Sequence, residues 1–292
     1  MEKIYSIIVT FNPELSIFKK LIQSLSKQKC YIYVIDNNSF NLQNIKEVVD
    51  NYGEVFEFLS NEGIAKAQNY GIRKALSDNA EFLLLLDQDS NIDDKFLSSM
   101  LNKYQMMNRK NDTVIGPLFY DSRYGFEYPQ IVFNQYGLRT KILASKNKVN
   151  EVSLLISSGM FMHKDVFINI GEFDEKLFID YVDSEWCFRA RNGGVKFYVY
   201  SDIVMYHEIG SDNIKLFKWR IPVHNPARRY YRIRNALYLF KYPHINKIIS
   251  LRETIFSICH QLILIFIYKD KMKNTKVLFS AVWSGLKGLL RK

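Results

Sequence analysis

Through its first 120 residues the chain alternates short apolar runs with longer amphipathic stretches. Apolar runs of about four to eight residues favour strands, and apolar side chains at helical spacing favour helices. The runs occupy residues 4–10, 31–36, 55–59, 82–86 and 114–117, and the helical stretches occupy 14–27, 41–51, 64–77 and 93–108. This order predicts an α/β fold with a mostly parallel central sheet and flanking helices on both faces.

The later part of the chain is less regular. Short strands are expected at residues 152–157, 159–163 and 203–206, with a short helix from residue 164. From about residue 207 the pattern is helical and basic to the end, so we place a boundary near residue 210. The Tyr-rich segment 120–150 predicts irregular structure or short strands.

Size and composition describe a folded globular chain. A length of 292 residues corresponds to one large domain or two modest ones, at about 150 residues per domain. The apolar content of 48% excludes a disordered or collagen-like protein. Cys30, Cys187 and Cys259 lie far apart without a C-x-x-C pair, so neither a disulfide framework nor a thiolate zinc site is expected. A reducing cytosol fits this cysteine usage.

No membrane-spanning segment is expected. Residues 1–10 form an apolar run without a basic leader or a small-residue cleavage site, which indicates a strand and not a signal peptide. The longest uninterrupted apolar run, residues 262–268, is shorter than the roughly 20 residues that a spanning helix needs.

Charge is distributed unevenly along the chain. Residues 211–292 contain 17 Lys and Arg against 3 Asp and Glu, a net charge of +14, whereas residues 1–210 carry −4. Basic residues there alternate with apolar stretches at 254–267 and 277–292, which favours helices lying on an anionic membrane surface. Two alternatives are helices that pack on the rest of the chain with a solvated basic face, and a homodimer interface. No nucleic-acid-binding signature appears, so no nucleic acid partner is expected.

Polar residues follow four of the predicted strands. The carboxyl ends of parallel strands meet at one edge of the sheet, where ligands of such folds bind. The residues at these ends are Thr10, Asn12, Asp36, Asn37, Asn61, Asp87 and Asp89. Neither G-x-G-x-x-G after the first strand nor G-x-x-x-x-G-K-[ST] occurs, which argues against a dinucleotide dehydrogenase and a P-loop enzyme.

Asp87 and Asp89 are two carboxylates separated by one residue at the end of a run of four leucines. Carboxylates at such a position suit a hard divalent cation that keeps open positions for phosphate oxygens. The alternative is an Asp-rich turn that caps the following helix, since Ser90 and Asp93 are also good N-cap residues.

Four segments, in this order and spacing, resemble the inverting family-2 glycosyltransferases of the GT-A fold. They are Thr10-Phe-Asn12, Asp36-Asn-Asn-Ser39, Asn61-Glu-Gly-Ile-Ala-Lys-Ala-Gln-Asn69 and Leu86-Asp-Gln-Asp-Ser90. The last two are most similar to bacterial L-rhamnosyltransferases that build O-antigen and capsular polysaccharides. The resemblance covers about residues 4–240. It implies a GT-A catalytic domain over 1–210, with a nucleotide-binding part at 1–118 and an acceptor part at 119–210, followed by the basic helical region 211–292.

The resemblance also implies roles for the strand-end residues. The residues implied to surround the nucleobase and ribose are Thr10, Asn12, Asp36 and Asn37. Asn61 and Asn69 are implied to lie under the nucleotide, and Asp87 to contact the donor. Asn37 stands where many relatives have a second aspartate. Asp89 and His207 hold a divalent cation, Mg²⁺ or Mn²⁺. For the asparagines the alternative is turn and cap chemistry, and a lone histidine is more often structural.

Asp183, within the segment 178–189, matches the position of the family's general base, which deprotonates the acceptor hydroxyl. Val182 stands where many relatives have Glu. Asp180 is a second candidate for the base. Alternatively, Asp183 and Glu185 merely begin a helix, where the helix dipole favours acidic residues.

An arginine cluster lies at residues 228–234. Arg228 and Arg232 fall on one face of the expected helix, beside Arg229 and Arg234. Guanidinium groups bind phosphate in a bidentate manner, so Arg228 and Arg229 could hold the donor diphosphate or the pyrophosphate of a lipid-linked acceptor. The alternative is a solvated basic helix face.

Together these features predict an enzyme that transfers L-rhamnose from dTDP-β-L-rhamnose, with inversion, to a hydroxyl of a lipid-linked glycan. It would act at the cytoplasmic face of the membrane as a peripheral protein. Two alternatives remain open. One is the same fold with UDP-galactofuranose, UDP-glucose or a UDP-N-acetylhexosamine as donor. The other is a non-catalytic protein that binds a sugar nucleotide or a nucleic acid.

Overall fold

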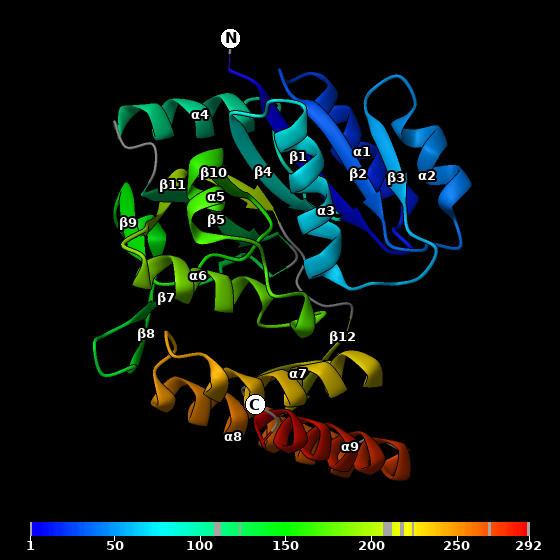
Figure 1. Ribbon diagram of the computed structural model, residues 1–292, viewed down its shortest axis with the longest axis vertical. Helices are drawn as coiled ribbons and strands as arrows, with labels where there is room; N and C mark the ends of the chain where they lie inside the picture. The colour runs from blue at the N-terminus through cyan, green and yellow to red at the C-terminus, as the bar shows by residue number, and fades with distance from the viewer. Residues whose placement is uncertain are drawn as a thin grey trace.

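The computed structural model describes residues 2–107, 112–122, 124–206, 212–216, 219–223, 225–267 and 270–290 (Figure 1). A parallel half-sheet comes first. It contains β1 (Ile4–Thr10), β2 (Tyr31–Asp36), β3 (Glu54–Glu57) and β4 (Phe82–Asp87), connected by α1 (Leu15–Ser26), α2 (Leu42–Val49) and α3 (Ile64–Ser77). The alternation of apolar runs therefore predicted the order of these elements correctly.

The second half of the sheet is mixed. It contains β5 (Thr113–Asp121), β9 (Val149–Val152), β10 (Met160–His163) and β11 (Lys196–Tyr206), with α4 (Phe96–Met106), α5 (Lys164–Ile170) and α6 (Val182–Asn192) beside them. The strand order is β3-β2-β1-β4-β10-β5-β11-β9. Only β9 and β10 on this path run antiparallel to their neighbours.

Small strands lie outside the main path. β6 (Phe126–Glu127) pairs with β5, and β7 (Gln130–Phe133) pairs with β8 (Arg139–Ile142) as a separate hairpin. The described residues also form 3₁₀ turns at Ala144–Lys146, before β9, at Glu175–Leu177, before α6, and at Leu239–Lys241, between α7 and α8. The segment 120–150 thus consists of short strands and irregular connections, as predicted.

The sheet is buried on both faces, and β4 shows why. Leu83 and Leu85 pack in one core, with side chains of α3, α5 and α6. Leu84 and Leu86 pack in the other core, with α1, α2 and α4. Because successive side chains of a strand point to opposite faces, an uninterrupted apolar strand needs helices on both sides.

The C-terminal part begins with a hairpin and ends with three helices. β12 (Asp212–Leu216) and β13 (Trp219–Val223) pair antiparallel, so the prediction that the chain is helical from residue 207 onward is wrong here. Their sequences place polar and apolar residues in near alternation, which is the period of a strand. α7 (Pro226–Tyr238), α8 (Lys247–Ile267) and α9 (Lys271–Leu290) then form a separate layer below the sheet and its helices (Figure 1).

α8 is 21 residues long, and its mean hydropathy of 1.5 over an 18-residue window would permit it to cross a membrane. The sequence expectation considered only uninterrupted apolar runs, whereas α8 reaches this length and hydropathy with polar residues within it; that no segment spans a membrane stays a prediction. About a third of that window is buried within the protein. The buried face includes Ser250, Thr254, Ser257 and Gln261, and Thr254 donates a hydrogen bond to the Ala236 carbonyl of α7. Here α8 packs on α7 through polar contacts.

Candidate functional site

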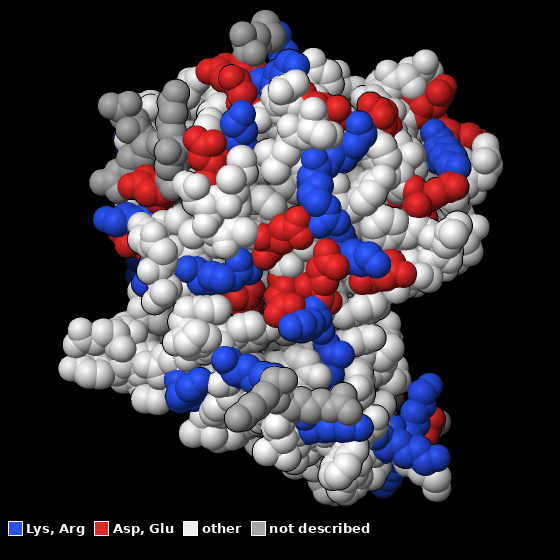
Figure 2. Space-filling model, viewed as in Figure 1, with Lys and Arg blue, Asp and Glu red and all other residues white. Residues whose placement is uncertain are grey.

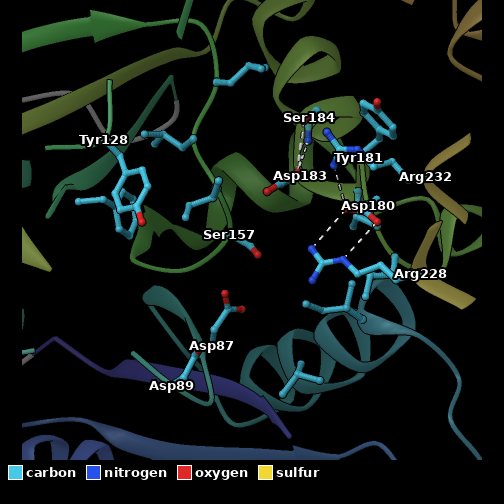
Figure 3. A pocket seen from close by; sticks show the side chains of 18 of the residues that line it. Asp87, Asp89, Tyr128, Ser157, Asp180, Tyr181, Asp183, Ser184, Arg228 and Arg232 are labelled. Atoms are coloured by element: carbon cyan, nitrogen blue, oxygen red, sulfur yellow. Dashed lines mark hydrogen bonds and ion pairs between the residues drawn. The ribbon is translucent and has the colours of Figure 1, made fainter. Parts of the chain in front are cut away.

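A large cavity lies between the carboxyl edge of the sheet and the helices α6, α7 and α8. Its volume is about 2360 Å³, well above the roughly 300–1,000 Å³ of a typical small-ligand pocket. The predicted site residues that line it are Asn37, Asn61, Asp87, Asp89, Asp183 and Arg228. The strand ends therefore meet at one edge, as the parallel order predicted, and α6 and α7 face them across the cavity (Figure 3).

In the turn from Asp87 to Ser90, the neutral side chains of Gln88 and Ser90 hold the backbone in place, and the acidic side chains do not. Gln88 accepts a hydrogen bond from the Phe11 amide at 2.7 Å, which joins the end of β4 to that of β1. Ser90 Oγ and Ser158 Oγ lie 2.9 Å apart, and both accept from the Asp87 amide. Among the described residues, none donates a hydrogen bond to the carboxylates of Asp87 or Asp89. The turn is held by its neutral residues, and its two acids are left for a ligand.

Negative charge accumulates around Asp87. Burial raises the pKa of its carboxyl to about 7, and the nearby charges of Asp89 and Asp183 add to the rise. Arg228 acts in the opposite direction. A site where carboxylates repel one another in this way is stabilised by a bound cation, and hard oxygen ligands match Mg²⁺ or Mn²⁺.

His207, the other residue predicted to hold the cation, lies outside the described residues. Within the part of the chain that the structure describes, no group of three or more His, Cys, Asp or Glu side chains is arranged to hold a metal ion.

Asp183 projects into the cavity from the first turn of α6, opposite Asp87 (Figure 3). Its carboxylate accepts a hydrogen bond from the Ser184 amide at 2.7 Å. Burial raises the pKa of Asp183 above its usual range, although backbone hydrogen bonds from Ser184 and Ser157 oppose the rise. A raised pKa makes the carboxylate a stronger base, which is the property that proton abstraction requires.

Asp180, the second candidate for the base, is occupied. Arg228 binds its carboxylate through two nitrogens at 3.3 Å, and Arg232 Nη1 lies 3.3 Å from Oδ1 (Figure 3). Asn225 caps α7 by accepting from the Arg228 amide at 2.8 Å, and Pro226 follows at the first helical position. This cap fixes the end of α7 that carries Arg228 beside the cavity.

The loop before Asp183 adopts an uncommon backbone. Phe178, Asp180 and Tyr181 have φ values of +66°, +62° and +64°, in the left-handed region that side chains other than glycine seldom adopt. Asn235 of α7, which is fully buried, donates from Nδ2 to the carbonyls of Leu177, Ile179 and Asp180 at 2.7, 2.8 and 3.1 Å. One amide therefore holds the loop that delivers Asp183.

Three predicted nucleotide-binding residues, Thr10, Asn12 and Asp36, are not among the residues that line the cavity, and their contact with a nucleotide stays a prediction. Thr10 Oγ1 donates to Asp36 Oδ1 at 2.9 Å, and Asp36 Oδ2 accepts from the Ser39 amide at 2.8 Å. Asn12, at a φ of +51°, accepts from the Phe40 amide. These contacts shape the loop that presents Asn37, whose Nδ2 donates to Asn61 Oδ1 at 3.0 Å.

Asn69 and Arg229 make structural contacts and are not among the residues that line the cavity, so their contact with the nucleotide stays a prediction. Asn69 is fully buried and bonds both the amide and the carbonyl of Phe173, joining α3 to the second half of the chain. Arg229 is also buried and bonds Gln261 Oε1 at 3.0 Å and the Ser257 carbonyl at 2.9 Å. Helical spacing turns Arg229 about 100° away from Arg228, toward α8.

Sequence reasoning missed the supporting residues. Gln88 and Ser90 stood within a recognised motif, but only their partners in the fold distinguish anchors from ligands. Asn235 lies seven residues after Arg228 on the same helix face, and this spacing is the one signal that could have identified it. Ser157 and Ser158 carried no signal in the sequence.

Residues 6–171 match the sequence profile of Glycosyl transferase family 2. The chain is 40% identical over 288 residues to the dTDP-rhamnosyl transferase RfbF of Shigella flexneri, covering 98% of this chain and 96% of that protein. A shorter match, 28% identical over 142 residues, is to the low-salt glycan biosynthesis hexosyltransferase Agl10 of Haloferax volcanii. It covers 46% of this chain and 45% of Agl10.

Among solved structures, the chain is similar to S. aureus TarS, with a TM-score of 0.61 and 20% identity. The match covers 98% of this chain and 49% of TarS, so the chain spans about half of that protein. The TarS fragment 1–349 in complex with UDP gives a TM-score of 0.59 at 19% identity, covering 99% of this chain and 81% of the fragment. At 19–20% identity, this similarity shows the fold alone.

Proposed function

The chain belongs to Glycosyl transferase family 2, and from this we propose that it transfers L-rhamnose from dTDP-β-L-rhamnose to a hydroxyl of a glycan, with inversion. It is a glycosyltransferase with the GT-A fold, as its sequence motifs predicted. Its substrate is therefore a nucleotide sugar. The choice of dTDP-rhamnose rests on the 40% identity to RfbF along nearly the whole of both chains.

The placement of Asp183 across the cavity from Asp87 and Asp89 carries the mechanism (Figure 3). Asp183 accepts the proton of the acceptor hydroxyl while the oxygen attacks the anomeric carbon and the nucleoside diphosphate leaves. A double displacement would require a carboxylate nucleophile beside the sugar. Asp180 is unsuited to that role because two arginines bind it.

Asp87 and Asp89 would hold the divalent cation, and His207 is retained as a further ligand. When bound, the cation neutralises the charge that develops on the leaving diphosphate. Arg228, whose side chain is 41% exposed in the cavity, supplies a second positive charge on the α7 side. Asn37 and Asn61 offer amide groups to the nucleoside at the β2 and β3 ends.

The acceptor is proposed to be lipid-linked, with the enzyme attached to the cytoplasmic face of the membrane through α8 and α9. The side chains of Phe279, Trp283 and Leu290 on α9 are 70%, 72% and 85% exposed. Figure 2 shows mainly basic side chains on the visible face of this layer and acidic ones at the waist above it. Exposed apolar residues among cations suit an interfacial helix on anionic lipid.

A donor panel tests the function. Purified protein with Mg²⁺ or Mn²⁺ is incubated with dTDP-L-rhamnose, UDP-glucose, UDP-galactofuranose and UDP-N-acetylglucosamine, and release of the nucleoside diphosphate is measured. The proposal expects release from dTDP-L-rhamnose in preference to the others. Preferential release from a UDP-sugar would contradict the proposed donor but would leave the assignment to the family unchanged. The Asp183→Asn variant serves as the control for release that depends on the site.

A further inference from the structure

The guanidinium group of Arg139, at the start of β8, forms no hydrogen bond or ion pair with the described residues. Its Nε atom is buried and forms no hydrogen bond. Burial lowers the pKa of Arg139, and the neighbouring cations Arg252 and Arg232 lower it further, whereas Glu253 raises it. A buried guanidinium nitrogen without an acceptor is costly unless a ligand supplies one.

The strand period places a second cation beside Arg139. Lys141 lies two residues further along β8, so both side chains project from the same face of the hairpin. The tip of this hairpin lies against the start of α8, since a Cβ at Gly137 would come within 2.9 Å of Asn246 and 3.2 Å of Ile249. Arg252 of α8 thereby faces the hairpin.

A depression of about 390 Å³ lies between these elements. Gly137, Leu138, Arg139, Lys141, Ile248 and Arg252 line it. Three of the six are cations, and none is a carboxylate. Arg139 also lines the main cavity, so the depression adjoins the cavity on the side of the segment 119–210.

Nearby acids neutralise only part of this charge. Glu253 forms an ion pair with Arg252 and also accepts from the Tyr181 hydroxyl at 3.1 Å. Asp180 is shared by Arg228 and Arg232. Arg139 and Lys141 remain without a described carboxylate partner, which gives the depression a net positive charge.

We propose that Arg139, Lys141 and Arg252 form a binding site for a phosphate group next to the transfer site. Arginine donates two parallel hydrogen bonds to phosphate oxygens, and lysine adds a point charge. The site rests on the proposed function and deepens it, because a phosphate held there belongs to the acceptor side and not to the donor. The group is either the pyrophosphate of a polyprenyl carrier or the headgroup of a membrane phospholipid.

Binding of inorganic pyrophosphate tests the site without turnover. Isothermal titration is performed on the full-length protein in the presence of saturating dTDP, which occupies the donor side. Arg139→Gln should weaken pyrophosphate binding about tenfold, and Arg139→Lys less. The matched control Lys148→Gln removes an exposed lysine outside the depression and should bind as the wild type does. Thermal unfolding should be unchanged in Arg139→Gln, since no protein hydrogen bond is lost.

Two probes distinguish the source of the phosphate. If the carrier supplies it, Arg139→Gln should weaken binding of geranyl diphosphate while flotation with phosphatidylglycerol–phosphatidylcholine vesicles stays unchanged. If a lipid headgroup supplies it, flotation of the Arg139→Gln variant should fall as well. Equal binding and flotation by wild type and Arg139→Gln would overturn the site. No step requires sugar transfer, and UDP replaces dTDP as the blocking nucleotide if the donor panel selects a UDP-sugar, so a wrong donor assignment leaves this test intact.

Discussion

At the scale of single residues, the carboxylates of the site differ in their partners. Asp180 is neutralised by Arg228 and Arg232, whereas Asp87 and Asp89 have no described hydrogen-bond donor. Asp183 accepts from backbone and hydroxyl groups that leave its charge in place. The hydrogen-bond and ion-pair partners therefore distinguish Asp180 from the acids proposed to act in catalysis, which residue type alone cannot do.

Replacing Asp183 with asparagine should lower the transfer rate by about 10²–10⁴-fold, the usual effect of losing a general base. The amide keeps the size and much of the hydrogen bonding but cannot accept the proton. Donor KM should change little, because the proposed nucleotide site at Asn37 and Asn61 lies on the opposite wall of the cavity. Steady-state kinetics measure both constants, with Asp50→Asn on the exposed surface as the control. A near-normal rate in Asp183→Asn would move the role of base to another residue.

The pH profile should reflect the raised pKa of Asp183. The base works only when deprotonated, so the transfer rate should fall as pH decreases through its pKa. Since burial raises that pKa above the ordinary 3.8, the fall should occur at a higher pH than for a free aspartate. The dependence of kcat on pH measures it. In Asp183→Asn the contribution of Asp183 to this limb should be lost, leaving only that of Asp87, whose pKa is about 7. A pH profile of the same shape as that of the wild type would contradict the assignment.

Removal of the cation should abolish transfer. Excess EDTA is expected to stop turnover, and Mg²⁺ or Mn²⁺ should restore it. Asp89→Asn should raise the metal concentration needed for half-maximal rate, because an amide is a weaker ligand than a carboxylate. Full turnover in EDTA would contradict the metal site. Asp202→Asn, a change at an exposed acid on β11, is the control.

At the scale of elements, α7 is what joins the C-terminal layer to the site. Its first turn brings Arg228 to the cavity, and Asn235, two turns later, holds the carbonyls of the loop before α6. Arg234 adds a bond to the Lys176 carbonyl at 2.7 Å. The ring of Phe178 in that loop stacks on Tyr231, with centroids 4.4 Å apart. The geometry of the base thus depends on a helix that follows it by some fifty residues.

Asn235→Leu should keep the volume of the side chain but leave three loop carbonyls without their donor. Each buried group left unsatisfied costs about 1–3 kcal/mol, so the free energy of unfolding should fall by at least that amount. The kcat should fall more than the donor KM rises, because Asp183 moves with the loop. Chemical denaturation and kinetics measure the two effects. Asn192→Leu, at the exposed end of α6, is the control, and equal kcat in both variants would contradict a positioning role.

At the scale of the whole molecule, net charge is segregated, since residues 1–210 carry −4 and residues 211–292 carry +14. The sheet with its helices carries the donor edge, and the C-terminal layer carries the basic residues and the exposed side chains of α8 and α9 (Figures 1 and 2). The cavity lies between the two, so an acceptor anchored in a membrane below α8 and α9 would approach the catalytic side of the cavity.

Replacing both Phe279 and Trp283 with serine should reduce flotation with anionic vesicles and leave binding to neutral ones weak. Each lysine or arginine near an anionic surface contributes about 1 kcal/mol, so added salt should weaken the binding of the wild type only in part. Apolar insertion supplies the remainder. Met106→Ser removes a side chain that is 79% exposed at the end of α4 and should float as the wild type does. Equal flotation of all three proteins would contradict membrane attachment through α9.

The sequence by itself determined the order of strands and helices through the first half. A short apolar run bounded by polar residues is compatible with few secondary structures other than a strand. The predicted bounds of the strands 4–10 and 31–36 and of the helix 64–77 agree with the structure to the residue. The sequence also indicated the family, since the segments around Asn12, Asp36, Asn61 and Asp87 together resemble the family-2 glycosyltransferases, and the match to Glycosyl transferase family 2 confirms that prediction. Such signals can be recognised in the sequence alone because they depend on neighbours within a few residues.

Only the tertiary structure decided which polar residues face the cavity. Arg228 and Arg229 are adjacent and chemically identical, yet one lines the cavity and the other is buried against α8. Asn61 and Asn69 share one motif, and only Asn61 reaches the cavity wall. Arg139 and Asn235 carried no motif at all. Their surroundings come from segments far away in the sequence, and the direction of a side chain relative to such segments is fixed only when the layers pack.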